Sequence, residues 1–563
     1  RVAAIDLRPI DSLLVHRDFL INSRSFTVHR ILIADSLPES ILAQYNEVPG
    51  ITVENRSGIS AEELAGVLSE YDGLVVRSRT RVTEELLENP GKLKVIGRAG
   101  AGVDNINTAA ATRKGIIVMN TPGGNTMAAA EHTIALLLSA LRNIPQAHAG
   151  MKADRWDRKL YMGHELFNKT VGVIGLGKIG LEVAKRLSAF QTNLLGYDPI
   201  LSPEIADRLG IELTDFEDLL KRSDIITIHA PKMPETIDMI NAENLKLCKD
   251  GVILVNCARG GLMNEAAVAE ALDSGKVSMA AFDVFVKEPP EDWTLARHPR
   301  AVATPHLGAS TEEAQTKVAA QILDQMLEYF QKNVAKNAVN FISVDERLQP
   351  TIAPYFGLAS QLGALFSKLQ DSRLRSVAIR FYGDAAELPS EPIASHLLAG
   401  ALQSDASKKN LASVDLVNMV NALEVAREKG ISLELTRKDK VLANFTNLIA
   451  CDFHTESEMI HLAGSLFARD TFRLVEFGKY DVDANLSEDL IVVINDDVPG
   501  IIGHIGTALA GAGINITRVS SGRDTADKTA ANLFNVEGKL EESLVKALST
   551  GEHIRRVQVA RKG

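Results

Sequence analysis

Residues 170–198 read TVGVIGLGKIGLEVAKRLSAFQTNLLGYD, and this stretch decides the fold of the chain. An apolar run leads into three glycines, Gly175, Gly177 and Gly180, and apolar side chains then recur at helical spacing. A second apolar run follows and ends at Asp198. A strand, a glycine turn, a helix and an acid in this order predict a dinucleotide-binding unit.

Each glycine has a separate expected role in that turn. Gly175 permits the tight turn, Gly177 lets the backbone approach a pyrophosphate, and Gly180 lets the helix pack close to the strand. The N-terminus of the helix that follows offers free N–H groups and the positive end of the helix dipole to the phosphates. Lys178 and Ile179 are therefore expected to contact the cofactor together with the glycines.

The acid at the end of the second strand predicts which dinucleotide binds. The carboxylate of Asp198 can accept hydrogen bonds from both ribose hydroxyls and would repel a 2′-phosphate. We therefore expect NAD as the cofactor and not NADP.

The rest of the chain predicts an α/β fold with four folded units. Apolar strands alternate with helix-length segments on both sides of the glycine turn, which is typical of parallel sheets covered on both faces. Helices are expected at 59–71, 83–91, 311–333 and 416–430, and one long helix at 128–151. The first two units form a Rossmann-like, two-lobed core, with a substrate lobe at 29–127 and 311–335 and an inserted, doubly wound NAD lobe at 128–310. An α+β unit is expected at 338–487. A βαββαβ unit is expected at 488–563.

Composition excludes several classes of function. At 563 residues the chain is too long for a single core. Its formal charge of −11 and pI near 5.7 argue against a nucleic-acid partner. No apolar run approaches the roughly 20 residues that span a bilayer, so no membrane partner is expected. The three cysteines lack metal-ligand spacing, so no metal site is expected and a reducing, cytoplasmic setting fits best.

The first 28 residues carry a mixture of signals. Four arginines suggest a transit peptide, but three aspartates count against one because such peptides are poor in acids. We expect a disordered extension, with import into an organelle as the alternative.

Three residues at consecutive expected strand ends predict the chemistry. Arg259 in NCARGG can bind a carboxylate with its two-pronged guanidinium, and His306 in TPHLGAS can move a hydroxyl proton. Glu288 in DVFVKEPP can set the charge state of the histidine. Taken singly, Arg259 fits a helix cap or a surface salt bridge, His306 fits a structural hydrogen bond, and Glu288 fits a solvated loop acid. Together, after a dinucleotide turn, they predict hydride transfer to or from a hydroxy acid.

Several further motifs make the chain similar to a known family. It resembles the D-isomer-specific 2-hydroxyacid dehydrogenases, and within them the long-form phosphoglycerate branch, over about 29–563. The motifs that carry this resemblance are VRSRTRVT (76–83), GRAGAGVDNIN (97–107), NTPGGNTMAAAEHT (120–133), YDP (197–199), NCARGG (256–261), DVFVKEPP (283–290) and ATPHLGAST (303–311).

The resemblance implies NAD-dependent oxidation of 3-phosphoglycerate toward serine and a role for each matching residue. His306 would take the hydroxyl proton, Glu288 would support the imidazolium, and Arg259 would hold the substrate carboxylate. Arg77, Ser78 and Arg98 are the candidates for the substrate phosphate. The implied cofactor-lining residues, besides Arg259 and His306, are Ala230, Cys257, Ala258, Asp283, Gly308 and Ala309, with Asp283 near the nicotinamide amide.

The resemblance also implies assembly and regulation. The family forms dimers and tetramers, and Arg155, Arg158 and Lys159 around Trp156 either reach a neighbouring subunit or form a solvated basic helix end. The last unit resembles an ACT domain, and the residues at its serine-binding positions are Asn495, Asp497 and Asn515. The alternative is an ACT fold without a ligand. Residues 338–487 resemble the intervening domain, proposed in the family as an anion or allosteric site.

Two other functions remain open at this stage. One is another reductase of the superfamily, acting on glyoxylate, hydroxypyruvate or a larger 2-keto acid. It should lack an arginine at position 77 and usually the two C-terminal units. The other is a NAD-sensing binding protein like the corepressors that share this fold.

Overall fold

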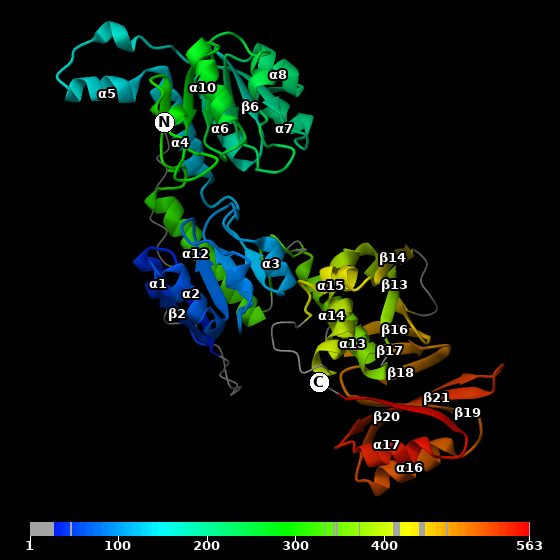
Figure 1. Cartoon of the computed structure of the whole chain (residues 1–563). Coiled ribbons are helices and arrows are strands. Elements are labelled where there is room, and N and C mark those ends of the chain that lie inside the picture. Colours follow the sequence, from blue (N-terminus) through cyan, green and yellow to red (C-terminus); the bar gives the residue numbers. More distant parts are fainter. Residues whose placement is uncertain are drawn as a thin grey trace, which may run out of the picture.

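The computed structural model describes residues 28–45, 48–332, 334–341, 344, 347–370, 372–408, 417–438, 445–468 and 471–561. Nearly all of the expected N-terminal extension lies outside the described residues. The strands form four separate sheets of five, seven, six and four strands. Figure 1 shows them in succession from the nucleotide-type lobe, labelled β6, to the red C-terminal unit. The expected mixed α/β architecture is confirmed.

The first sheet is entirely parallel, in the order β2-β1-β3-β4-β5. Apolar clusters lie on both of its faces, which explains why its central strands are apolar without alternation. Within residues 83–91 the structure has only the short 3₁₀ turn Glu85–Leu87, so the helix expected there is wrong; Pro90 and Gly91 stand where the helix would have to continue. The elements are β1 (His29–Ile33), α1 (Glu39–Tyr45), β2 (Ile51–Asn55), α2 (Ala61–Val67), η1 (Leu68–Glu70), β3 (Gly73–Val76), η2 (Glu85–Leu87), β4 (Val95–Arg98), α3 (Thr108–Arg113) and β5 (Ile117–Met119).

The second sheet is also parallel, in the order β12-β11-β10-β9-β6-β7-β8. The strand order reverses at β6, which lies between β7 and β9, and ligands bind at such reversals beyond the carboxyl ends of the strands. The strands are β6 (Thr170–Ile174), β7 (Asn193–Tyr197), β8 (Ile211–Leu213), β9 (Ile225–Ile228), β10 (Val252–Asn256), β11 (Val277–Phe282) and β12 (Ala301–Ala303). The helices are α6 (Lys178–Ala189), α7 (Pro203–Arg208), α8 (Phe216–Arg222), α9 (Ala242–Leu245), α10 (Glu265–Ser274) and α11 (Thr294–Arg297).

Two connections join the first lobe to the second. The outgoing one contains α4 (Thr126–Leu141), α5 (Ile144–Lys152) and η3 (Arg158–Tyr161). The single long helix expected at 128–151 is therefore wrong. Asn143 adopts a left-handed conformation with φ of 51°, and Pro145 opens α5, so the chain turns between the two helices. The returning connection is α12 (Glu312–Lys332), whose buried residues join the core of the first sheet, as expected.

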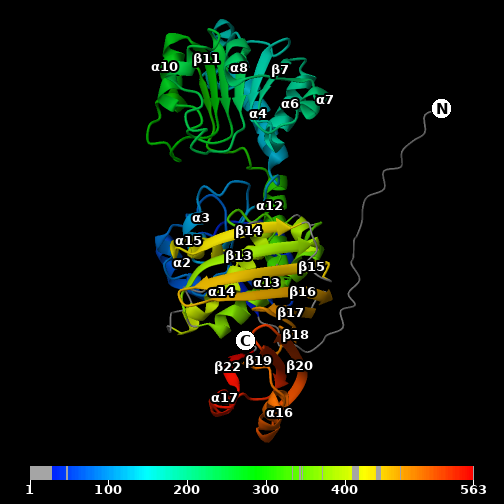
Figure 2. The same cartoon turned by 90° about the vertical axis from the view of Figure 1, so that its right-hand side faces the viewer.

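The third unit contains a mixed sheet in the order β14-β13-β15-β16-β17-β18. Its helices α13 and α14 pack together and share one core with one face of the sheet (Figure 2). The expected helix at 416–430 is confirmed only for its second half, Ala422–Glu428. The elements are α13 (Gln349–Leu369), β13 (Leu374–Gly383), η4 (Asp384–Glu387), α14 (Ser390–Lys408), α15 (Ala422–Glu428), β14 (Ser432–Lys438), β15 (Asn447–Thr455), β16 (Met459–Ala468), β17 (Thr471–Phe477) and β18 (Tyr480–Asn485).

The fourth unit is a βαββαβ fold with the antiparallel order β20-β21-β19-β22, as expected. Alternate residues of β19 face opposite sides: Ile491 and Val493 pack on the helices, whereas Leu490 and Val492 join the core of the third unit. The elements are β19 (Asp489–Asp496), α16 (Ile501–Gly511), β20 (Asn515–Asp524), β21 (Thr529–Glu537), α17 (Glu542–Ser549) and β22 (Ile554–Ala560).

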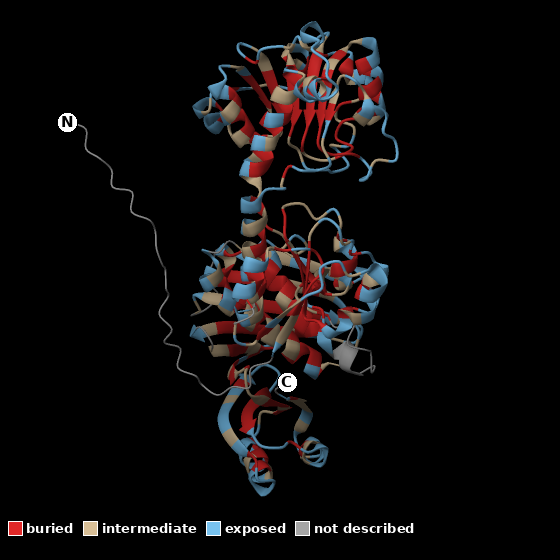
Figure 3. Cartoon of the chain, turned by 90° about the vertical axis from the view of Figure 1, so that its left-hand side faces the viewer, coloured by how far each residue is buried: buried red, intermediate tan, exposed pale blue. Residues whose placement is uncertain are grey.

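The third unit is fastened to the edge of the first sheet by asparagine side chains. Asn418 donates from Nδ2 to the carbonyl oxygen of Gly115 at 2.8 Å. Asn340 accepts from the backbone N of Val118 at 2.8 Å and donates to the carbonyl oxygen of Ile116 at 2.9 Å. Figure 3 shows buried strands at the centre of the nucleotide-type lobe and exposed faces on the helices around it. Within the described part of the chain, every helix is too short or too polar to cross a membrane.

Candidate active site

The glycine turn has the geometry that a bound pyrophosphate requires. Gly175 has a φ of 83°, which side chains rarely adopt, and a Cβ at Gly180 would lie 2.0 Å from the carbonyl oxygen of Gly175. At Gly177 a Cβ would meet no atom within 4 Å, so the approach to the start of α6 is open. Gly177 caps α6 without a side-chain hydrogen bond, which leaves N–H groups for a ligand. These residues fit a dinucleotide.

Asp198 follows β7 directly and faces the glycine turn. Its Oδ2 accepts from the backbone N of Leu176 at 2.7 Å, and its Oδ1 accepts from the backbone N of Ile200 at 2.8 Å and of Leu201 at 3.0 Å. A carboxylate has about four acceptor sites, so hydrogen bonds from a ribose remain feasible. The backbone contacts fix the carboxylate in the place where the sequence predicts ribose recognition.

His306 and Glu288 form a close pair in the nucleotide lobe. The Nδ1 of His306 lies 2.7 Å from the Oε2 of Glu288, and both side chains are about two-fifths exposed. Burial acts to raise the pKa of Glu288, but the hydrogen bond to His306 and one from the backbone N of Phe285 outweigh it, so this pKa is lowered. The ionised carboxylate therefore holds Nδ1, and Nε2 is left to face a reacting group.

The loop that carries His306 is held by Asp283. This buried carboxylate accepts from the backbone N of Leu307 and of Gly308, both at 2.8 Å, and from the hydroxyl of Thr304 at 2.5 Å. His132 of α4 lies 3.1 Å from the same carboxylate. His306 itself has a φ of 53°, a strained conformation that the surrounding contacts must hold.

Arg259 reaches from the nucleotide lobe to the first lobe. Its Nε donates to the Oδ2 of Asp104 at 2.9 Å, and its Nη1 donates to the carbonyl oxygen of Ala258 at 2.7 Å. The Arg259 side chain is 30% exposed. The structure therefore brings Arg259 to the loop 98–104, where Arg98 also lies.

Arg98 is a desolvated cation. Its Nε is buried without a hydrogen-bond partner, and among the described residues no carboxylate lies within ion-pair distance of it. Burial, followed by repulsion from Arg259, lowers the pKa of Arg98 to about 10. Asp104 and Asp35 act to raise this pKa, but burial and Arg259 outweigh them. A guanidinium in this state suits the binding of an anion, which would add a direct ion pair.

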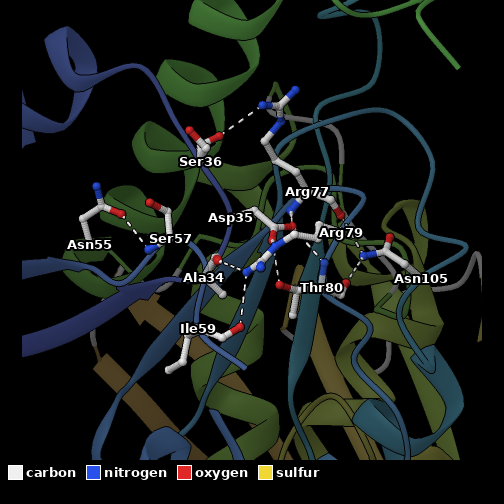
Figure 4. A network of polar contacts seen from close by, with 10 residues as sticks. All are labelled: Ala34, Asp35, Ser36, Asn55, Ser57, Ile59, Arg77, Arg79, Thr80 and Asn105. Carbon is white, nitrogen blue, oxygen red and sulfur yellow. Dashed lines mark hydrogen bonds and ion pairs between the residues drawn. The ribbon is translucent and has the colours of Figure 1, made fainter. Parts of the chain in front are cut away.

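Arg77 lies close enough to Arg98 for its charge to help lower the pKa of Arg98. Figure 4 shows the loop of Arg77 and the contacts by which Asp35 holds it. Asp35 accepts from the backbone N of Arg77 at 2.6 Å and from the hydroxyl of Thr80 at 2.6 Å, and it pairs with Arg79 at 3.2 Å. Among the described residues, the Arg77 side chain itself donates only to the carbonyl oxygen of Ser36, at 3.1 Å. Arg79 is thus neutralised by a carboxylate, whereas Arg77 keeps donors for a ligand.

The remaining expected cofactor residues lie around the strand ends of the nucleotide lobe. The backbone of Ala230 approaches Gly175 closely, and Lys178 donates to the carbonyl oxygen of Pro122 at 3.3 Å. Burial raises the pKa of Cys257 to about 12, so its thiol stays neutral. Ala258 contacts Arg259 through its carbonyl oxygen, Ile179 packs into the lobe core, and Gly308 is bonded to Asp283. Ala309 is partly exposed beside it, and Ser78 is exposed beside Arg77.

The basic residues expected to reach a neighbouring subunit lie on an exposed arm. Arg155, Arg158 and Lys159 are exposed, and the Trp156 between them is 74% exposed. The arm follows α5, which projects away from the nucleotide lobe in Figure 1. These residues do not reach Arg98 or Arg259 of the same chain through any contact among the described residues.

The three expected serine-binding residues do not meet within one chain. Asn495 is buried, and its Oδ1 accepts from Asn532 at 2.7 Å, while Asp497 is bonded to Arg523 at 2.6 Å. Asn495 pairs across the sheet with Ala530, near one end of β21, whereas Asn515 pairs with Glu537 at the other end. At about 3.3 Å per residue, roughly 20–25 Å separate the two ends.

Three residues that the sequence reasoning assigned no role contribute to the site. They are Asp104, which holds Arg259, Asp35, which holds the loop of Arg77, and His132, which contacts Asp283. Asp104 lies in the motif at 97–107 and His132 in the motif at 120–133, but the residues that they contact are distant in sequence. Only the fold joins them.

Comparison with known families agrees with this geometry. Residues 134–308 match the NAD-binding domain of D-isomer specific 2-hydroxyacid dehydrogenases, residues 351–478 match the D-3-phosphoglycerate dehydrogenase intervening domain, and residues 490–549 match the ACT domain. The expected third and fourth unit types are thereby confirmed.

The solved structures match about half of the chain. The TT0316 protein from Thermus thermophilus, 33% identical, and a glyoxylate reductase from Paecilomyes thermophila, 30% identical, each superpose on 55% of the chain with a TM-score of 0.51, over 99% and 98% of their own lengths.

The curated relatives cover nearly the whole chain. D-3-phosphoglycerate dehydrogenase from Archaeoglobus fulgidus is 39% identical over 88% of this chain and 92% of its own length. The enzyme of the same name from Bacillus subtilis is 37% identical over 92% of this chain and 97% of its own length. The chain belongs to the D-3-phosphoglycerate dehydrogenase family.

Proposed function

We propose that this chain catalyses the NAD-dependent oxidation of 3-phospho-D-glycerate to 3-phosphohydroxypyruvate, the first step of L-serine biosynthesis. Family membership over nearly the full length supports the reaction. The observation that carries the proposal is the pairing of His306 with Glu288 in a lobe whose Arg259 meets the desolvated Arg98. An acid–base group and a cluster of cations suit a hydroxy acid with two anionic ends.

His306 acts as the general base in this proposal. Its Nε2 takes the proton from the C2 hydroxyl, and Glu288 at Nδ1 stabilises the imidazolium that forms. The glycine turn and Asp198 would hold NAD, which would supply the hydride acceptor for C2. In the reverse direction, the imidazolium returns the proton to the C2 oxygen.

The arginines divide the two anionic groups of the substrate between them. Arg259 binds the carboxylate and the C2 oxygen, while Arg77, Ser78 and Arg98 hold the phosphate. A phosphate monoester carries a charge of about −1.5 to −2 at neutral pH, enough to engage more than one guanidinium. The buried Nε of Arg98, which has no hydrogen-bond partner among the described residues, supports this assignment.

The decisive experiment compares two substrates that differ only in the phosphate. Purified protein should oxidise NADH with phosphohydroxypyruvate at a kcat/KM at least about tenfold above that with hydroxypyruvate, since lost charged contacts cost about 1.5–3 kcal/mol each. Equal values for the two acids would remove the phosphate assignment and leave a general 2-keto acid reductase.

The two other functions receive less support. A glyoxylate or hydroxypyruvate reductase would have no use for Arg77 and Arg98, nor for the third and fourth units that the phosphoglycerate relatives share. A NAD-sensing corepressor is disfavoured because such proteins attach peptide-docking or disordered extensions, whereas the rest of this chain matches two further folded domains.

We further propose the unit boundaries expected from the sequence: 29–127 with 311–335, 128–310, 338–487 and 488–563. The proposed assembly is a homo-oligomer. The arm after α5 supports it, because Trp156, Leu160 and Met162 are each more than 70% exposed and need apolar cover. Light scattering of the wild type and of Trp156→Ala should show a shift toward monomer in the variant.

L-serine is the proposed ligand of the ACT domain. Because Asn515 lies at the opposite end of its sheet from Asn495 and Asp497, a site made of all three needs a second copy of the domain. Titration of L-serine should inhibit the wild type and have less effect on Asn515→Ala, whose side chain is exposed. An equal response of both proteins would remove Asn515 from the site.

A further inference from the structure

We propose that Asp104 is a positioning residue for the reaction, which holds the guanidinium of Arg259 in its productive orientation from the opposite lobe. The inference rests on the proposed function in one respect, namely that Arg259 binds the substrate carboxylate. Asp104 itself need not touch the substrate.

The hydrogen bonds of Arg259 carry the argument. Asp104 fixes its Nε at 2.9 Å, and the carbonyl oxygen of Ala258 fixes its Nη1 at 2.7 Å. A guanidinium has five N–H groups in one plane. Two bonds to different nitrogens therefore fix that plane, and they leave both N–H groups of Nη2 and one of Nη1 for a ligand. That remaining edge can bind a carboxylate with two parallel hydrogen bonds.

The pair joins two lobes that are distant in sequence. Asp104 and Arg259 are separated by 155 residues, and their side chains are 58% and 30% exposed. Ion pairs this exposed contribute little to stability. The value of the pair therefore lies in where it places Arg259, because it aims a residue of the nucleotide lobe at the loop that also carries Arg98.

The loop 98–104 fits closely around both guanidinium groups. A Cβ at Gly102 would lie 2.0 Å from Nη2 of Arg259 and 2.7 Å from Oδ2 of Asp104. A Cβ at Gly100 would lie 2.1 Å from Nη1 of Arg98. Glycine at both positions is what lets the two arginines lie against the backbone. An added methyl at Gly102 would push Arg259 aside without changing any charge.

Asp104 also offsets the repulsion between the two arginines. Arg259 lowers the pKa of Arg98, whereas Asp104 acts to raise it. Without Asp104, Arg259 would be free to turn away from Arg98 toward water. A shift of about 1 Å in a substrate-holding group can reduce a rate by roughly two orders of magnitude.

The test replaces Asp104 with Asn, which keeps the shape and removes the charge. We expect kcat of Asp104→Asn to fall about tenfold, while KM for the 2-oxo acid changes less than about threefold and NADH affinity stays the same. Gly102→Ala should lower kcat similarly. Asp207→Asn, an exposed aspartate on α7, is the matched control and should leave all constants unchanged.

A double variant shows whether Asp104 acts through Arg259. In an Arg259→Lys background, the side chain has no fork for Asp104 to orient, so Asp104→Asn should add less than about a twofold loss. A full tenfold loss in that background would overturn the inference. So would an unchanged kcat with a lower KM in the single variant, because Asp104 would then merely compete with the substrate for Arg259.

The assay uses whichever of phosphohydroxypyruvate, hydroxypyruvate and glyoxylate the wild type reduces fastest. If the wild type prefers an unphosphorylated acid, the proposed substrate is wrong, but the Asp104 comparison still decides this inference. Melting temperatures within about 2 °C of the wild type would show that the variants are folded.

Discussion

The acid–base pair and the arginine group of the site differ in how complete they are without a ligand. His306 and Glu288 are bonded to each other at 2.7 Å within one lobe. The arginines come from two lobes, and the buried Nε of Arg98 has no hydrogen-bond partner in the part of the chain that the structure describes. The proton-transfer machinery is thus already formed by the fold, whereas the anion-binding machinery is left short of negative charge. In the proposed reaction, the substrate supplies that charge.

This difference has a physical basis. A histidine that must exchange a proton needs a fixed neighbour, and Glu288 can be that neighbour permanently. A cation that must bind an anion has to keep donor groups that no protein carboxylate occupies, because the ligand would otherwise have to displace that carboxylate. Arg259 meets this condition, since Asp104 holds its Nε and leaves Nη2 for a ligand. Arg79, which is paired with Asp35 on the loop of Arg77, shows the alternative state.

The largest expected effect comes from removing the imidazole of His306 from the acid–base pair. His306→Gln should lower kcat by more than about 10²-fold, as loss of a general base does, while NAD still binds. Stopped-flow NADH oxidation and fluorescence titration of NADH would measure the two quantities. His454→Gln, an exposed histidine on β15, is the control. Normal turnover in His306→Gln would mean that the histidine is structural.

Glu288→Gln should have the next largest effect, a fall in kcat of about 10- to 100-fold. Without the carboxylate the imidazolium is less stable, and reduction of the keto acid needs the imidazolium as proton donor. The alkaline limb of the rate profile for reduction should therefore move to lower pH. A profile that keeps its position would show that Glu288 does not act on His306.

Arg98→Met tests the arginine group of the site. It should weaken substrate binding without lowering the stability of the protein. The KM for phosphohydroxypyruvate should rise about tenfold, since a charged contact is lost. The melting temperature should stay constant or rise, because a desolvated cation without a partner is replaced by an apolar side chain of similar length. Arg208→Met, on the exposed face of α7, is the control. A marked loss of stability would contradict the idea that Arg98 waits for its anion.

Asp283→Asn should have the smallest effect of these four substitutions, since it only loosens the loop that carries His306. Burial acts to raise the pKa of Asp283, but hydrogen bonds from His132, Thr304 and Leu307 outweigh it, so this pKa is lowered. The ionised carboxylate then stabilises the folded protein fully at pH values above the ordinary aspartate pKa near 4. This stabilisation is lost as the pH falls through the lower pKa that Asp283 has in the folded protein.

The stability of this variant should follow the same pH window. At pH 7 its melting temperature should lie a few degrees below that of the wild type, because charge-assisted hydrogen bonds contribute about 1.5–3 kcal/mol. The difference should shrink below about pH 4. Calorimetry at pH 7 and pH 3.5 would measure it, and a constant difference would assign the loss to packing.

Local patterns in the sequence were enough to predict the parts of the site whose signals lie close together. The glycine turn, Asp198 and the two Rossmann-like lobes each follow from a strand–turn–helix pattern within 30 residues or so. The separate strand ends that carry Arg259, Glu288 and His306 could be predicted because carboxyl ends of parallel strands meet at one edge.

Other features could not be read from local patterns. The contact of Asp104 with Arg259 joins residues 155 positions apart in two lobes, and the missing partner of Arg98 is a property of its surroundings. The division of 128–151 into α4 and α5 did have a local signal in Pro145, which the long apolar run outweighed. The shortened helix at 422–428 reflects Asn418, whose side chain bonds to Gly115 in another lobe.

The two-sided packing of the fourth sheet limits how the chain can be cut. Leu490, Val492 and Leu533 share one core with Leu474 and Ala484 of the third unit. A truncated protein ending near Glu488 would expose this apolar surface to water and would be prone to aggregate. Inactivity of such a fragment would then report misfolding instead of lost feedback, so regulation in this chain has to be dissected by single substitutions in the intact protein.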